Sequence, residues 1–195
     1  EVIILGVFLI MAISQLALEL VNCLAMSIVT PHSLPRMDFS RGIPSEFLTL
    51  TVVPTVITSP QNIASLIEAL EVRFLANRDE HMFFGLLTDF PDAHQETLAE
   101  DASLLRLAQE RVEELNAKYK KGKYDIFFLL HLPRRWNPQE EIWMGYERKR
   151  GKLADLNWLL RGGPRENFLL IVGEIAVLTN VKYIITLDTD THLPR

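Results

Sequence analysis

A long apolar segment opens the chain and limits what the chain can fold into. From Val2 to Val29 nearly every residue is apolar, and a helix needs only about 20 such residues to cross a bilayer. Three polar side chains, Gln15, Glu19 and Asn22, recur at helical spacing on one face. A carboxyl group in a membrane helix faces other helices or a water-filled cavity, not lipid. The segment therefore predicts one transmembrane helix, residues 1–30, that belongs to a larger bundle.

Two alternatives exist for this segment, a buried core helix and a signal peptide. The segment lacks the basic start and the small-residue cleavage site of a signal peptide. Arg36 and Arg41 follow it, and positive charge beyond a membrane helix indicates the cytoplasmic side.

Residues 31–46 contain prolines, which a helix interior does not tolerate, and they predict an extended connector. These prolines are Pro31, Pro35 and Pro44.

Beyond the connector, apolar runs rich in β-branched residues alternate with amphipathic helical patterns. The expected strands are residues 47–53 (ended by Pro54), 82–87, 124–130, 168–172 and 183–187, and the expected helices are residues 61–75, 96–119 and a third that starts near residue 148. Such alternation predicts an α/β domain with a parallel or mostly parallel sheet and helices on both faces. The length of 195 residues fits one domain with an appendage.

Polar side chains follow the ends of the expected strands. They are Thr55, Asp89, Asp92, His131, Asp188 and Asp190. Parallel strands put their carboxyl ends on one edge of the sheet, where ligands bind in open α/β folds. Asp188 and Asp190 can share a divalent cation that also binds a phosphate. The alternative is ordinary turn chemistry, which Asp also favours. A phosphatase signature fails because His192 occupies its fifth position.

A basic stretch precedes the expected third helix. Arg148, Lys149, Arg150 and Lys152 lie at or before its first turn, where cations oppose the helix dipole. A bound diphosphate would make this placement favourable, held by free N–H groups, a flexible Gly151 and the lysines. A solvated basic surface and a lipid-binding patch are the alternatives.

Nearby aromatic and histidine side chains have simpler expectations. Core packing is favoured for Trp136, Trp143 and Tyr146, although aromatic faces also stack on sugars. His131 is expected to be a hydrogen-bonded residue at the sheet edge, because no second histidine stands at metal-ligand spacing. The net charge of −5 argues against nucleic acid as a partner, and the single Cys23 excludes an internal disulfide. The ends of the sequence, with no initiator Met and a stop after the Asp188 loop, indicate a segment of a longer polypeptide.

Four stretches together resemble the glycosyltransferase domain of bacterial cyclic β-1,2-glucan synthases. They are LPRMDFSRGIPSEFLTLTVVPTVITSP, LLTDFPDA, RRWNPQEEIWMGYERKRGKLADLN and YIITLDTDTHLPR, and they span residues 34–195 in family order. The resemblance implies a GT-A-type fold, with residues 47–195 as the N-terminal, nucleotide-sugar-binding half of the domain. It also implies UDP-glucose as donor, a Mg²⁺ or Mn²⁺ cofactor and a β-1,2-glucan acceptor. The location implied is the bacterial inner membrane, with the transferase part facing the cytoplasm.

The resemblance also implies roles for single residues. Thr55 would line the nucleoside pocket, and Asp89 would contact the uracil or ribose. Lys149 or Lys152 would face the diphosphate, and the KRGK spacing lets either one align. Asp188 would hold the donor and the metal, and Asp190 would bind the metal.

One departure from the family limits the expected activity. The acidic motif that supplies the general base, and the Arg-Trp motif after it, are absent from residues 1–195. These residues are therefore expected to bind donor without catalysis. Another processive synthase, of the cellulose or hyaluronan kind, and a non-catalytic membrane-anchored nucleotide-binding module are the alternatives.

Overall fold

The computed structural model describes residues 1–29, 39–40, 42–119 and 124–191. It divides into two units, residues 1–38 and residues 39–195. The predicted connector, residues 31–46, is described only at residues 39–40 and 42–46. Several residues named above lie outside the described parts, namely Pro31, Pro35, Arg36, Arg41 and His192.

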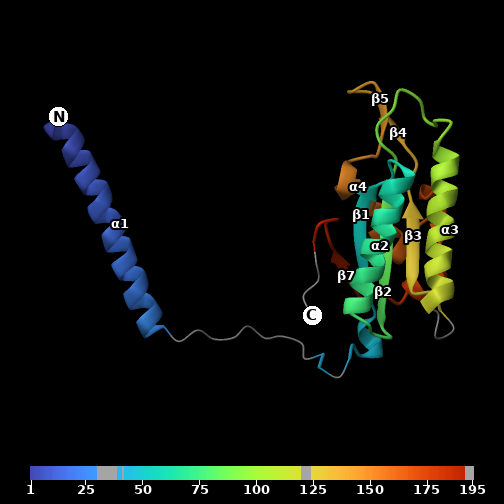
Figure 1. The fold of residues 1–195 in the computed structure, drawn as a ribbon, viewed down its shortest axis with the longest axis horizontal. Helices are drawn as coiled ribbons and strands as arrows, with labels where there is room; N and C mark the ends of the chain where they lie inside the picture. Colours follow the sequence, from blue (N-terminus) through green and yellow to red (C-terminus); the bar gives the residue numbers. More distant parts are fainter. Residues whose placement is uncertain (30–38, 41, 120–123, 192–195) are drawn as a thin grey trace. The chain divides into compact units, whose positions relative to one another are not determined.

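In the first unit, residues 1–29 are described, and they contain a single helix, α1, which spans Val2–Ile28 (Figure 1). Within the described residues it is the one helix that is long and apolar enough to cross a membrane. None of its residues is buried, so it does not form part of a core in this unit. Gln15, Glu19 and Asn22 are exposed along it.

Five strands form the central sheet of the second unit, in the order β6-β3-β2-β1-β7 (Figure 1). Their bounds are β1 Thr49–Val56, β2 Met82–Asp89, β3 Phe127–His131, β6 Leu170–Val172 and β7 Tyr183–Thr186. Only β6 runs antiparallel to its neighbour. The prediction of a mostly parallel sheet is therefore confirmed.

Helices cover both faces of this sheet, as predicted. On one face lie α2, Pro60–Ala76, and α3, Asp101–Tyr119, which share a hydrophobic cluster with alternate residues of β1, β2 and β3 (Figure 1). On the other face, α4, Arg148–Leu160, and α5, Ile175–Leu178, pack on the remaining strand residues. Short 3₁₀ helices span Ser45–Phe47 and Arg165–Asn167. This alternation of burial is what a strand covered on both sides requires.

The prediction that Pro54 ends the first strand is wrong, because β1 continues through it to Val56. The backbone N–H and C=O groups of the even-numbered residues of β1 point towards β7, as the hydrogen bond from Leu187 N to the Val52 carbonyl oxygen shows. The pairing of β1 with β7 stops at Val52–Thr186, so Pro54 faces a position beyond the paired part of β7. Because no residue of β7 is paired with β1 at that position, the absence of an N–H group on Pro54 breaks no hydrogen bond between the strands. The strand thus includes Pro54, Thr55 and Val56, and it places Thr55 at the carboxyl-end edge of the sheet.

The other strand ends differ from the expected ranges by at most three residues, and two further differences are larger. The helix expected from residue 96 begins at Asp101, whose carboxylate accepts hydrogen bonds from Leu98 N and from Arg134. A two-stranded antiparallel hairpin, β4 Arg135–Asn137 and β5 Ile142–Met144, was not predicted. Its strands have three residues each, too few for a period to be visible in sequence. The hairpin joins the β2–α3 loop through an isolated bridge between Ala93 and Trp143.

Candidate functional site

The chain turns sharply before α4, and this turn sets the position of the basic residues. Glu147 and Arg148 both have left-handed backbone, with φ of 48° and 56°. A Cβ on Gly151 would lie 1.9 Å from the carbonyl oxygen of Tyr146. Glycine is therefore needed here for close backbone approach, and not for the flexibility that the sequence suggested.

A buried ion pair joins α4 to the carboxyl ends of β1 and β2. Lys152 Nζ donates to Asp89 Oδ1 at 2.6 Å and to the Thr55 carbonyl oxygen at 2.8 Å. Lys152 is 4% exposed and Asp89 is 3% exposed. Gly145 lies against the other side of the carboxylate, since a Cβ there would approach Asp89 Oδ2 to 1.9 Å. Three predicted site residues thus meet at one edge of the sheet.

Burial dominates the electrostatics of this pair. Burial raises the pKa of Asp89, although the charge of Lys152 and its hydrogen bond oppose the shift. Burial likewise lowers the pKa of Lys152, against the attraction of Asp89. Each group therefore depends on the other to stay ionised, because an unpaired buried charge is costly.

A second lysine–aspartate pair lies in solvent. Lys149 Nζ donates to Asp188 Oδ1, and the two side chains are 59% and 58% exposed. Asp188 follows β7, and the side chain of Asp190, two residues on, is also exposed. The first turn of α4 therefore links Asp89 and Asp188 through Lys152 and Lys149.

The carboxylates of Asp188 and Asp190 suit a hard divalent cation in their chemistry. Mg²⁺ is commonly held by one or two carboxylates together with substrate phosphates and water. Among the described residues, no group of three or more His, Cys, Asp or Glu side chains gathers as a metal site. A cation at these two carboxylates would therefore need further oxygen ligands from a phosphate or from water.

The two arginines of the basic stretch are also paired. Arg148 donates to both carboxylate oxygens of Asp92, at 2.9 and 2.7 Å, and Arg150 lies 3.3 Å from Glu147. With the two lysines, all four cations at the start of α4 have a carboxylate partner. Protein carboxylates thus supply negative charge where the sequence suggested a bound anion, and they connect this turn to the β2–α3 loop.

His131 is a buried residue of the sheet edge, as predicted. Its Nδ1 shares a hydrogen bond of 2.8 Å with Thr88 Oγ1, the residue opposite it in β2. The side chain is fully buried, and its ring lies 4.3 Å from that of Phe90. Burial lowers the pKa of His131 to about 3, so the imidazole is neutral at physiological pH. Its Nε2 is buried and has no hydrogen-bond partner in the described structure.

Core packing, which was expected of the aromatic residues near the site, is wrong for Trp136 and Tyr146. Trp136 is 47% exposed and stacks at an angle on Trp143 across the hairpin, with ring centroids 5.8 Å apart. Tyr146 is exposed, and the Arg135 guanidinium lies 5.5 Å from its ring. Trp143 is half-buried. These rings line a hairpin at the surface because the strands of that hairpin are too short to build a core.

Two buried arginines organise loops near the site and were missed in the sequence. Arg134 makes a two-pronged pair with Asp101, at 2.5 and 3.2 Å, and donates to the carbonyls of Pro91 and Glu96. Arg73, on α2, donates to backbone carbonyls of the loop that carries Asp188. A signal for Arg73 was present, because it follows Leu70 by three residues on the apolar stripe of α2.

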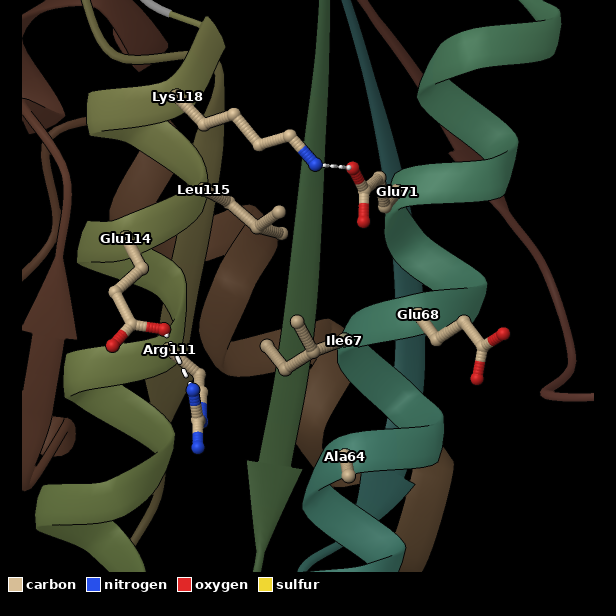
Figure 2. A pocket seen from close by; sticks show the side chains of 8 residues that line it. All are labelled: Ala64, Ile67, Glu68, Glu71, Arg111, Glu114, Leu115 and Lys118. Carbon is tan, nitrogen blue, oxygen red and sulfur yellow. Dashed lines mark hydrogen bonds and ion pairs between the residues drawn. The ribbon is translucent and has the colours of Figure 1, made fainter.

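A separate groove lies between α2 and α3, the two helices that cover one face of the sheet (Figure 2). Its volume is about 330 Å³, and Ile67 and Leu115 point into it from the two helices. Lys118 pairs with Glu71 at 2.7 Å across its upper end. The other residues that line it are Ala64, Glu68, Arg111 and Glu114. None of the predicted site residues lines this groove.

The sequence similarity of the chain agrees with the resemblance inferred above. No protein-family model matches the chain. The cyclic beta-(1,2)-glucan synthase NdvB of Rhizobium meliloti (strain 1021) is 40% identical to it over 182 residues. The chain is similar to a segment of a cyclic β-(1,2)-glucan synthase. This segment covers 93% of the chain and 6% of the length of NdvB. The similarity to NdvB confirms the predicted resemblance, and the roles of single residues remain predictions.

Proposed function

We propose that this chain is the donor-binding part of a membrane-bound inverting glycosyltransferase that transfers glucose from UDP-glucose to a growing β-1,2-glucan. The observation that carries the proposal is the linkage of Asp89, Lys152, Lys149 and Asp188 around the first turn of α4. The similarity to NdvB gives this linkage its chemical meaning. The mostly parallel sheet with helices on both faces is compatible with a GT-A-type fold for residues 47–195.

The two lysines receive different roles in this proposal. Lys149 is exposed beside Asp188 and would turn to the diphosphate of the donor, where its charge stabilises the departing UDP. Lys152 would keep Asp89 ionised and in place beneath the nucleoside. Thr55, whose carbonyl Lys152 binds, would line the same pocket. Burial is what separates the two lysines, which sequence spacing alone leaves equivalent.

The metal of this site would be Mg²⁺ or Mn²⁺, held by Asp188 and Asp190. When bound, it would act as a Lewis acid that neutralises charge on the diphosphate. The residues themselves would orient the donor: Asp89 from the nucleoside end and Lys149 from the phosphate end. A donor fixed at both ends presents its anomeric carbon to the acceptor hydroxyl in one orientation.

The membrane part of the proposal rests on α1. We place α1 in the bacterial inner membrane, with the transferase part in the cytoplasm and the face of Gln15, Glu19 and Asn22 against other transmembrane helices. The glucan is the acceptor, and nucleic acid is not a partner, in keeping with the net charge of −5.

A thermal melt of the full-length protein in detergent tests donor binding. UDP with Mn²⁺, at a hundredfold excess over the dissociation constant, is expected to stabilise the transferase part by about 2.7 kcal/mol. UDP with a chelator should give a smaller shift. The double variant Asp188→Asn with Asp190→Asn should lose the metal-dependent part, whereas the control Glu114→Gln, on the surface of α3, should retain it. A folded protein with no UDP shift would contradict the proposed donor site and support a non-catalytic interaction module.

A further inference from the structure

Arg73 holds the loop that follows β7 by its backbone. Its Nη2 donates to the carbonyl oxygens of Thr189 at 2.8 Å, Thr191 at 3.0 Å and Asp188 at 3.3 Å, and its Nε donates to Thr191 O at 3.3 Å. Arg73 comes from the last turn of α2, more than a hundred residues earlier in the chain. One guanidinium thus reaches three carbonyls of a single turn.

The environment of Arg73 is unusual for a positive charge. The residue is 5% exposed, and the hydrogen-bond partners that the described residues give it are all backbone carbonyls. Burial lowers its pKa, yet arginine keeps its charge in proteins. A buried cation held only by carbonyl dipoles is costly for a purely structural contact. An apolar side chain would fill the same space on the apolar stripe of α2 without that cost.

The geometry of the turn separates its carbonyls from its carboxylates. The carbonyls of Asp188, Thr189 and Thr191 are bound by Arg73, while the side chains of Asp188 and Asp190 are exposed. The other backbone restraints on the turn are few, with Thr191 N bonded to Asp188 O and Leu187 N bonded to Val52 O. Since β7 is a four-residue edge strand, Arg73 is the main anchor of the turn among the described residues.

We propose that Arg73 is a positioning residue that fixes the 188–191 turn so that the Asp188 and Asp190 carboxylates are presented together to a divalent cation and a nucleoside diphosphate. This inference rests on the proposed function of the two carboxylates. Substitution of residues that hold metal ligands in place by hydrogen bonds, without contacting the metal, commonly lowers metal affinity by roughly 10–100-fold.

The test compares Arg73→Gln and Arg73→Lys with the control Arg111→Gln in the full-length protein. Arg111 is an exposed arginine of α3 that pairs with Glu114. UDP affinity is measured by calorimetry with Mn²⁺ and with a chelator. Arg73→Gln should weaken binding by at least about tenfold with Mn²⁺ and less than about twofold with the chelator. Arg73→Lys should fall between, because an ammonium lacks the planar fork that reaches several carbonyls. Arg111→Gln should match the wild type.

Hydrogen exchange gives a second readout that needs no ligand. Arg73→Gln should speed exchange of the hydrogen-bonded amides of Leu187 and Thr191 while the β2 amides stay protected, which also shows that the domain is folded. Equal losses of UDP affinity with and without Mn²⁺, or unchanged exchange in the turn, would overturn the positioning role. A wild-type protein that binds no UDP would instead contradict the proposed function. In that case the hydrogen-exchange result would still decide whether Arg73 holds the 188–191 turn in place. If Arg73→Gln loses protection in β2, the same comparison is made with Arg73→Lys.

Discussion

The two lysine–aspartate pairs of α4 use the same residue types, three positions apart, in opposite environments. Lys152 and Asp89 are both nearly inaccessible to solvent, whereas more than half of each side chain is exposed in Lys149 and Asp188. The difference follows from the sheet. Asp89 ends β2, an internal strand, and Asp188 follows β7, an edge strand. One pair is therefore part of the protein interior, and the other is accessible to a ligand.

This contrast teaches that sequence spacing and chemical type do not assign a role to a lysine. A buried ion pair loses much when one partner is removed, because the other charge remains without water or a partner. An exposed pair contributes little to stability, because water and salt screen it. Substitutions at the two lysines should therefore separate folding from binding.

The largest effect is expected at the buried pair. Lys152→Met should lower the free energy of unfolding by about 3–5 kcal/mol, because Asp89 is left buried and unpaired. Urea titration of the detergent-solubilised protein measures the change. Adding Asp89→Asn should recover part of the loss, since it removes the stranded charge. A loss below about 1 kcal/mol in the single variant would contradict the contrast, as the pair would then behave like a surface pair.

An intermediate effect is expected from pH at His131, whose protonation is disfavoured chiefly by burial and, to a smaller extent, by the charge of Lys152. The folded protein holds His131 neutral down to a pKa of about 3, against an ordinary value of 6.5. The unfolded chain thus binds the proton first. Stability is fully present above pH 6.5 and falls towards pH 3, by about 1.4 kcal/mol for each pH unit.

The variant His131→Asn isolates this contribution. Asparagine can still form a hydrogen bond with the Thr88 hydroxyl but does not titrate. Between pH 6.5 and pH 5 the wild type should lose about 2 kcal/mol more than the variant. Asp89 titrates in both proteins, so its contribution cancels in the comparison, whereas Asp101 is coupled to His131 and its negative charge opposes the lowering of the His131 pKa. Parallel stability curves for the two proteins would show that His131 is solvated and not buried neutral.

The features of the fold and site that could be predicted from the sequence are those that depend on residues close together in the chain. The strands and helices were predictable because their apolar periods are local, and the placement of Thr55 and Asp89 at one edge of the sheet followed from the rule that parallel strands end together. The continuation of β1 through Pro54 could not be predicted, because it depends on where β7 ends, at Thr186, 132 residues later. The burial of Lys152, the roles of Arg73 and Arg134, and the exposure of Trp136 also depend on which segments pack nearby. A lysine in a basic run resembles a surface residue until its neighbours are known.

The smallest effect on stability, and the most informative for function, is expected at the exposed pair. Lys149→Met should change the free energy of unfolding by less than about 1 kcal/mol, because both members of the pair remain solvated without each other. The same variant should weaken UDP binding, since a charge that faces the diphosphate is lost.

Arg150→Met serves as the matched control: Arg150 lies one residue away on the same turn, is more exposed, and pairs only with Glu147 among the described residues. Equal UDP affinities for Lys149→Met, Arg150→Met and the wild type would remove Lys149 from the proposed donor site. If Lys149→Met alone loses affinity, the two lysines divide as their burial indicates, with Lys152 stabilising the fold and Lys149 binding the ligand.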